Sequence, residues 1–191
     1  LVLEALDHAD ASAAAAALAD LDPAAYRPFN LIVADARDAY WLRHAGALPG
    51  FAFRTREGSL RAIEPIRLPG AAVSDGGRSG GIECQPIPAG LSMLTARELN
   101  DPNSARIAHY LERWRAAPPP DPGADDWSAW TRLLADRESP DGDPRNAMAI
   151  VAAGDYGTVC SSLVALSASG RPVMKFAAGT PGETEFEPVT I

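Results

Sequence analysis

The sequence predicts a mixed α+β protein in which helices and strands occupy separate stretches of the chain. Three observations lead to this prediction. The stretch from Leu1 to Leu21 is rich in alanine, the residue that favours a helix most. Two later stretches carry apolar residues at helical spacing, and most other apolar runs are short and end in Gly, Pro or Asp turns. This segregation favours α+β layers over alternating βαβ units.

Composition and charge limit the classes of function. The chain has 191 residues, of which 47% are hydrophobic and 22% charged, and we expect a single globular domain over residues 1–191. Its net charge of -8 is opposite in sign to the basic field of a nucleic-acid-binding protein. No run of about 18 apolar residues predicts a membrane span. Cys84 and Cys160 lack metal-ligand spacing, and a reducing, cytoplasmic setting is the simplest interpretation.

The N-terminal half predicts one helix followed by strands. A helix over Leu1–Leu21 ends at Asp22-Pro23, because proline disfavours the helical conformation of the residue before it. Phe29–Ala34 and Ala39–His44 are apolar runs around a polar turn and predict a β-hairpin. The first of them is apolar on both faces, so we expect both faces to be covered. Two further strands are predicted to be edge strands, because both contain proline: Leu60–Leu68 and Ile82–Pro88.

The C-terminal half predicts two helices and then a sheet. One helix is expected to start at Asp101-Pro102 and to end near Arg115, before a proline-rich stretch. A second is expected from Trp127 to Arg137, with its tryptophans and leucines on one face. The remaining apolar runs predict four strands, at Ala147–Ala153, Thr158–Ser167, Pro172–Ala178 and Glu183–Val189.

The side chains that most often carry chemistry form no self-sufficient catalytic group in the sequence. The three histidines show no metal-ligand spacing, so no metal site is predicted, and they are interpreted as surface or interface residues: His8, His44 and His109. Cys160 is expected to be a small buried residue of an inner strand rather than a nucleophile. The tryptophans are expected to pack in the core rather than to form a ligand cage: Trp41, Trp114, Trp127 and Trp130.

Three stretches in this order resemble the NRDE family, also called the transport-and-Golgi-organisation protein 2 family: Tyr26–His44, Pro88–Trp114, and Tyr156–Leu166 followed by Gly170–Phe176. The leading helix is also similar to the helix that precedes the Phe-Asn strand in that family. The resemblance implies a four-layer αββα sandwich like that of the N-terminal nucleophile hydrolases. The Met-Cys start and the Asn-Arg-Asp-Glu motif of the family are missing, so we expect the C-terminal two-thirds of such a protein, with its fold incomplete at the N-terminus.

The same resemblance implies a candidate pocket formed by Asn30, Ser92, Met93, Thr158, Cys160 and Ser161. Family members often carry an asparagine where this chain has Met93, and an arginine where it has Val159. Neither replacement can stabilise an oxyanion. We therefore expect no catalytic residue in this chain, because the N-terminal Cys nucleophile is also missing.

Three functions remain open. The resemblance implies small-ligand binding or trafficking related to haem or acyl lipids, and His44 and His109 are the candidate haem ligands. The first alternative is a Cys-dependent amidohydrolase or acyltransferase of N-terminal nucleophile type in the full-length protein. The second alternative is a structural or interaction domain. The expected partners are a small-molecule ligand, and either a second copy of the chain or the missing N-terminal segment.

Overall fold

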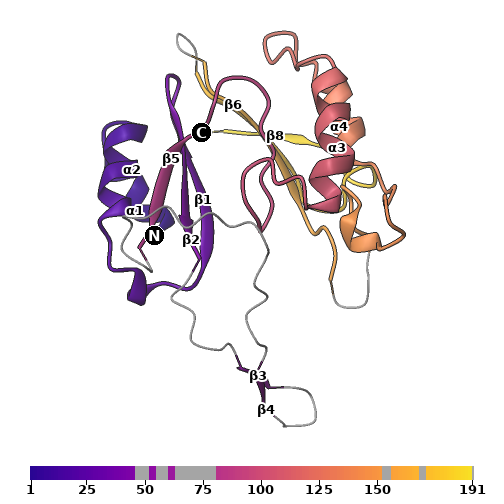
Figure 1. Cartoon of the computed structure of the whole chain (residues 1–191). Helices are drawn as coiled ribbons and strands as arrows, with labels where there is room; N and C mark the ends of the chain where they lie inside the picture. Colours follow the sequence, from indigo (N-terminus) through magenta and orange to yellow (C-terminus); the bar gives the residue numbers. More distant parts are fainter. Residues whose placement is uncertain (46–51, 55–59, 63–80, 152–155, 168–170, 191) are drawn as a thin grey trace. The chain divides into compact units, whose positions relative to one another are not determined.

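The computed structural model describes residues 1–45, 52–54, 60–62, 81–151, 156–167 and 171–190. In this part of the chain, four α-helices and two three-stranded antiparallel sheets confirm the mixed α+β prediction (Figure 1). They do not amount to the four-layer sandwich that the resemblance implies. The chain divides into two compact units, Leu1–Ile87 and Pro88–Ile191. None of the described helices is long and apolar enough to cross a membrane.

The first unit contains two α-helices, a β-hairpin and three further short strands among its described residues. Its elements are α1 (Val2–Ala5), α2 (Ala11–Ala19), a 3₁₀ turn (Pro23–Ala25), β1 (Phe29–Ala34), β2 (Ala39–His44), β3 (Ala52–Arg54), β4 (Leu60–Ala62) and β5 (Glu83–Pro86). The predicted hairpin is confirmed with the same bounds. β2 lies between β1 and β5, and both pairings are antiparallel. The prediction of a strand over Leu60–Leu68 extends past β4 into residues outside the described part.

The predicted helix over Leu1–Leu21 is wrong in one respect, because the chain leaves the helix between α1 and α2. The cause is Asp10, whose extended backbone (φ -150°) lets its side chain accept a hydrogen bond from the Ala13 N–H at 2.8 Å. Aspartate is strongly preferred at this capping position. A new helix therefore starts at Ala11 instead of continuing from α1.

The core of the first unit lies between α2 and one face of the β1–β2–β5 sheet. Helix α2 contacts all three strands (Figure 1), and the buried cluster consists of Ala15, Leu18, Leu42 and Ile82. The prediction that β1 is covered on both faces is wrong. Ile32, which points away from this cluster, is 51% exposed. Alternation of side chains along the strand places Leu31 and Val33 on the covered face and Ile32 on the other.

Asp35 links the hairpin turn to the start of α2. Its carboxylate accepts hydrogen bonds from the backbone N–H groups of Ala11 (2.9 Å), Arg37 (2.7 Å) and Asp38 (2.9 Å). The pKa of Asp35 is lowered from 3.8 to about 2, first by the bond from Ala11 and then by those from Asp38 and Arg37. The Asp35 carboxylate therefore connects the hairpin turn to the first residue of α2.

We predict that Asp35→Asn lowers the melting temperature of the chain by several degrees at pH 7. A lowered pKa means that the ionised group stabilises the fold above its ordinary pKa, and that this stabilisation is lost as the pH falls through about 2. Thermal melts followed by circular dichroism at pH 7 and pH 2 measure the difference between variant and wild type. The difference should shrink at pH 2, and Asp38→Asn in the same turn is the control. A melting-temperature difference of the same size at pH 2 would show that the ionised Asp35 carboxylate is not the group that stabilises the fold.

The second unit consists of two helices and a three-stranded sheet. Its elements are α3 (Ala105–Ala116), α4 (Ser128–Leu134), a 3₁₀ turn (Pro144–Asn146), β6 (Ser161–Ala165), β7 (Val173–Ala177) and β8 (Glu187–Val189). β7 pairs antiparallel with both β6 and β8. Helix α3 starts later than predicted, because Ser104 caps it by accepting the Ile107 N–H, whereas the Asp101 side chain accepts the N–H of Asn103 in the preceding turn.

The strand predicted over Ala147–Ala153 is absent from its described portion, residues 147–151. The backbone there finds irregular partners instead of a strand ladder. The Ala149 N–H donates to the carbonyl of Asp136 at 2.8 Å, and the Ile150 N–H donates to the Thr158 hydroxyl at 2.9 Å. The backbone groups of this buried segment are thus partly satisfied without a sheet, as buried backbone requires.

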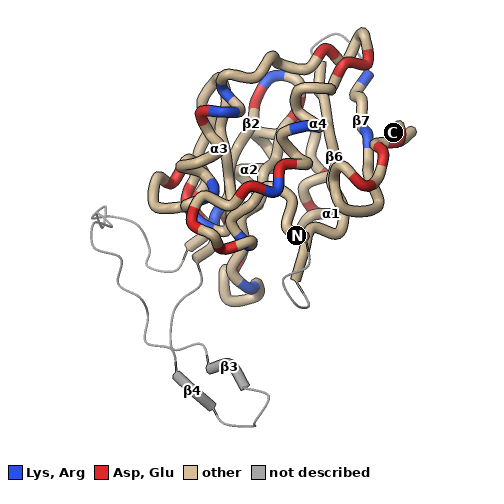
Figure 2. Tube along the Cα trace, turned by 90° about the vertical axis from the view of Figure 1, so that its right-hand side faces the viewer, with Lys and Arg blue, Asp and Glu red and all other residues tan. Residues whose placement is uncertain are grey.

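A charged network ties α3 to the segment that follows α4. Arg113 donates to the carboxylates of Asp136 and Glu138, and the buried Tyr110 hydroxyl lies 3.1 Å from Asp136 and 2.6 Å from the carbonyl of Glu138. Figure 2 shows acidic and basic positions interspersed along this part of the chain, whereas α2 carries no charge. These polar contacts add to the buried apolar residues of the second unit, which include Ile107 and Leu163.

Candidate functional site

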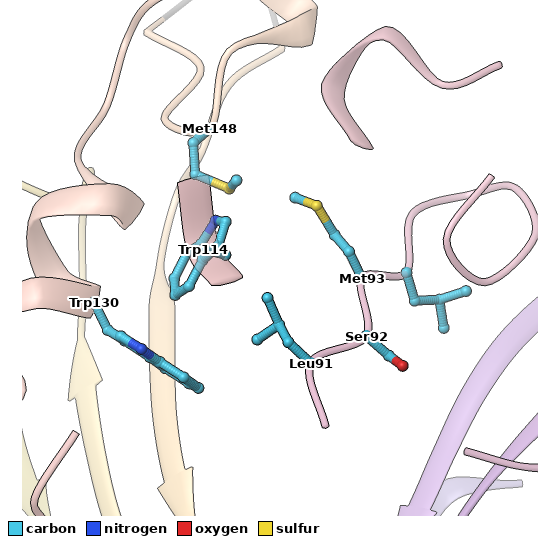
Figure 3. Close-up of a pocket in the computed structure, with 7 residues that line it drawn as sticks. Leu91, Ser92, Met93, Trp114, Trp130 and Met148 are labelled. Atoms are coloured by element: carbon cyan, nitrogen blue, oxygen red, sulfur yellow. The ribbon is translucent and has the colours of Figure 1, made fainter. Parts of the chain in front are cut away.

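An apolar cavity of about 230 Å³ lies within the second unit (Figure 3). We call it the tryptophan pocket, and it is lined by Leu91, Ser92, Met93, Leu94, Trp114, Trp130 and Met148. Four separate segments supply these residues: the loop before α3, each of the two helices, and the irregular segment after the Pro144–Asn146 turn. Figure 3 shows the Met93 and Met148 side chains extending towards each other, and the Ser92 hydroxyl directed away from the indoles.

The two helices position the aromatic wall of the tryptophan pocket. Trp114 is in the last turn of α3 and Trp130 is in α4, and their rings meet edge to face, with centroids 5.1 Å apart at 83°. This geometry is the favoured one for aromatic pairs. The Nε1 atom of each indole is buried and has no hydrogen-bond acceptor among the described residues. A buried N–H without a partner costs free energy.

Asn100 holds the loop that forms the opposite wall. Its backbone N–H donates to the Met93 carbonyl at 2.8 Å, and its side-chain oxygen accepts the Met93 N–H at 2.7 Å. Its amide nitrogen lies 3.4 Å from the Ser92 hydroxyl. Asn100 has a φ of +56°, a left-handed conformation in which asparagine is enriched. The sequence interpretation missed this positioning residue, although an asparagine directly before Asp-Pro is a recognisable turn signal.

Within the second unit, only part of the pocket implied by the family resemblance lies together. Ser92 and Met93 line the tryptophan pocket. The other residues of the second unit are elsewhere: Thr158 bonds the backbone of Ile150, and Ser161 pairs with Ala177 in the sheet. Asn30 is in the first unit, where its side-chain oxygen accepts the Trp41 indole N–H at 3.0 Å.

Cys160 differs from its predicted environment, and both cysteines are exposed. Cys160 lies just before β6 and is exposed, so the prediction of a buried inner-strand residue is wrong. The ladder starts only at Ser161, because the preceding Thr158 backbone bonds to Ile150 instead of to a strand. Cys84 is also exposed. Partial desolvation raises the pKa of the Cys84 thiol, which lowers the fraction of reactive thiolate.

Neither candidate haem ligand has the surroundings that a haem needs. His44 is 4% exposed, which corrects its interpretation as a surface residue, and its ring packs against Phe29 with centroids 5.8 Å apart. Its Nδ1 atom is buried without a hydrogen-bond partner. The Nε2 atom of His109 lies 2.9 Å from Arg113 and 3.8 Å from Glu138. Neither histidine lines the tryptophan pocket, so the described residues do not fit a haem as they stand.

Metal coordination has no evident site in the described ranges, where no three His, Cys, Asp or Glu side chains converge.

The fold and the site thus define a mixed α+β protein whose second unit holds an apolar pocket with an aromatic wall. No protein-family profile matches the chain, and no curated protein or solved structure shows significant similarity to it.

Proposed function

We propose that this chain binds a small, mainly apolar ligand in the tryptophan pocket. The observation that supports the proposal is the lining, in which two indoles, two thioethers and two leucines face one cavity. Ligand pockets are typically lined in this way, with few polar groups. Burial of apolar ligand surface in such a cavity is favourable by about 25 cal/mol per Å².

The volume of the cavity favours a ligand the size of one ring or a short acyl chain. An apolar cavity of about 150 Å³ holds benzene, and sites for drug-sized ligands have about 300–1,000 Å³. The tryptophan pocket, at about 230 Å³, lies between these sizes. A tetrapyrrole combines four such rings in one plane and is too large. Of the two ligand classes that the NRDE resemblance suggests, the size therefore favours an acyl group over haem.

The apolar lining suggests that the part of the ligand held in the pocket is a ring or a hydrocarbon chain. The Nε1 atoms of Trp114 and Trp130 have no hydrogen-bond partner among the described residues, but both are fully buried and offer no donor to a bound ligand. A short acyl chain fits this lining and this volume, so we propose short acyl compounds as the ligand class.

We further propose that the chain is related to the NRDE family. The stretches that resemble the family, the mixed α+β elements and the presence of Ser92 and Met93 in one pocket support this relation. The four-layer αββα sandwich and a cytoplasmic role in ligand trafficking are part of the same proposal. Determination of the complete polypeptide upstream of Leu1 tests the relation, since a Met-Cys start is expected there.

The ligand proposal predicts saturable binding of a hexanoyl thioester of N-acetylcysteamine, followed by tryptophan fluorescence. Leu91→Phe fills the cavity and should weaken this binding at least about tenfold, a loss of roughly 1.4 kcal/mol. The matched control is Leu166→Phe, because Leu166 is 44% exposed and does not line the tryptophan pocket. Toluene should compete with the thioester for the cavity, whereas haemin should show no saturable Soret shift.

Two results would contradict the ligand proposal. One is a fluorescence change that does not saturate with the thioester or with toluene. The other is equal weakening by Leu91→Phe and Leu166→Phe, which would place binding outside the cavity. Haemin binding that is lost in His44→Ala would instead support the haem alternative.

A further inference from the structure

We propose that the outer edge of strand β1 pairs with the same edge of a second copy of this chain. β1 lies at one side of the β1–β2–β5 sheet, with β2 as its neighbour in the described part. Such edges attract further strands, and proteins usually protect them with lysine, proline or a bulge. The β1 sequence, FNLIVA, carries no charge and no proline, and its register with β2 is unbroken from Phe29 to Ala34.

A groove follows this edge of the first unit. It has a volume of about 340 Å³, and its wall includes every residue from Leu31 to Asp35. Successive residues of a strand face opposite sides of a sheet. A groove that touches all of them therefore lies beside the backbone and not over one face. Its other wall includes Val2 and Leu6, which are 64% and 77% exposed.

The register of the hairpin identifies the backbone groups that point into this groove. The Asp35 N–H donates to the Asp38 carbonyl, and hydrogen-bonded and non-hydrogen-bonded pairs then alternate along an antiparallel ladder. By this alternation Val33 bonds to Tyr40 of β2, while Ile32 and Ala34 direct their N–H and C=O groups outwards. The carbonyl of Ala39, opposite Ala34, accepts from Ile87 on the far side of β2, which agrees with this assignment.

These outward groups are self-complementary. Antiparallel pairing of two copies about a twofold axis at Val33 sets Ile32 of each copy opposite Ala34 of the other. Residues in such a pair exchange both of their backbone hydrogen bonds. The pairing therefore uses the outward N–H and C=O groups of Ile32 and Ala34 in each copy and joins two three-stranded sheets into one. It also brings the exposed Ile32 of each copy against the other copy.

The absence of charge on β1 suits this strand to self-association in an acidic chain. Two copies with a net charge of -8 each repel one another at long range. An uncharged strand avoids adding like-charge pairs across the twofold axis, which would be destabilising. Salt screens the long-range repulsion without weakening backbone hydrogen bonds. Dimer formation should therefore strengthen with ionic strength.

Light scattering of the full 191-residue chain over a range of concentrations tests this proposal, and a dimer that dissociates on dilution is expected. Ile32→Lys should raise the Kd of the dimer at least about tenfold, because the charge enters the interface twice. Val164→Lys is the matched control, since Val164 is 53% exposed in strand β6 of the other unit. Its Kd should equal that of the wild type.

A pair of proline variants separates loss of the interface from loss of the fold. Ala34→Pro removes an outward N–H and leaves the bonds to β2 in place, so it should abolish the dimer while the monomer still melts cooperatively. Val33→Pro removes a bond to β2 and should destabilise the first unit itself. A monomeric wild type at all concentrations would overturn the proposal, as would a dimer that Val164→Lys dissociates and Ile32→Lys leaves intact.

Discussion

Replacing Leu42 by alanine is expected to lower the free energy of unfolding of the first unit by about 2–5 kcal/mol. Leu42 is in the central strand β2 and has no exposed surface. It packs with Ala15 and Leu18 of α2 and with Ile82 in one buried cluster. Alanine would leave a cavity between the helix and the sheet, because the paired strands on both sides of β2 limit collapse around it.

Thermal melts at neutral pH measure this loss, and Leu3→Ala is the control. Leu3 is 77% exposed in α1 of the same unit, so the same substitution there should change the free energy by less than about 0.5 kcal/mol. For a unit of this size, the loss at Leu42 should lower the melting temperature by more than about 8 °C. Equal effects at Leu3 and Leu42 would show that the buried cluster does not hold the first unit together.

The elements of the first unit were predictable where local signals agree with packing. The hairpin over Phe29–His44 has its predicted bounds, since its apolar runs and its polar turn indicate the same structure. The break between α1 and α2 was missed, although Asp10 is a strong capping residue. Alanine on both sides of Asp10 favours helix everywhere, so composition alone hides the cap.

The candidate site was harder to predict, because its residues come from segments that the sequence does not connect. Trp114 and Trp130 were expected in the core. Both line the tryptophan pocket instead, where their rings meet edge to face. Met148 was assigned to a strand, but it lies in an irregular segment whose backbone bonds to Asp136 and Thr158. Side-chain periodicity cannot reveal a segment held by such long-range contacts.

The surroundings of the residues suggested by the family resemblance also depend on contacts that the sequence does not reveal. Ser92 and Met93 both line the tryptophan pocket, because they are adjacent in one loop. The exposure of Cys160 depends on where the β6 ladder starts, which a run of strand-like residues does not indicate. Asn100 was not singled out, because its role depends on two hydrogen bonds to the Met93 backbone.

The second large effect is expected for Tyr110→Phe, which should lower the free energy of unfolding of the second unit by about 1–3 kcal/mol. Tyr110 is fully buried in α3, and its hydroxyl lies within hydrogen-bond distance of the Asp136 carboxylate and the Glu138 carbonyl. Burial raises the pKa of Tyr110, so the hydroxyl stays a donor at neutral pH. Phenylalanine keeps the ring and leaves these acceptors with one donor fewer.

Asp136 gives this prediction a pH dependence. Burial alone would raise the pKa of Asp136, but hydrogen bonds from the Glu138 N–H and the Tyr110 hydroxyl, together with Arg113, outweigh it and hold the pKa below 3.8. The ionised carboxylate therefore stabilises the fold above its ordinary pKa, and this stabilisation is lost as the pH falls through the lowered value. The difference between wild type and Tyr110→Phe should accordingly narrow below about pH 4.

Chemical denaturation at pH 7 and at pH 3 provides the measurement, with Tyr156→Phe as the control. Tyr156 is 60% exposed in the same unit, so loss of its hydroxyl should have little effect at either pH. A small loss for Tyr110→Phe at pH 7 would mean that water replaces the hydroxyl. That result would show that the Tyr110 hydroxyl contributes little to the link between α3 and the segment after α4, which would then depend on the ion pairs of Arg113.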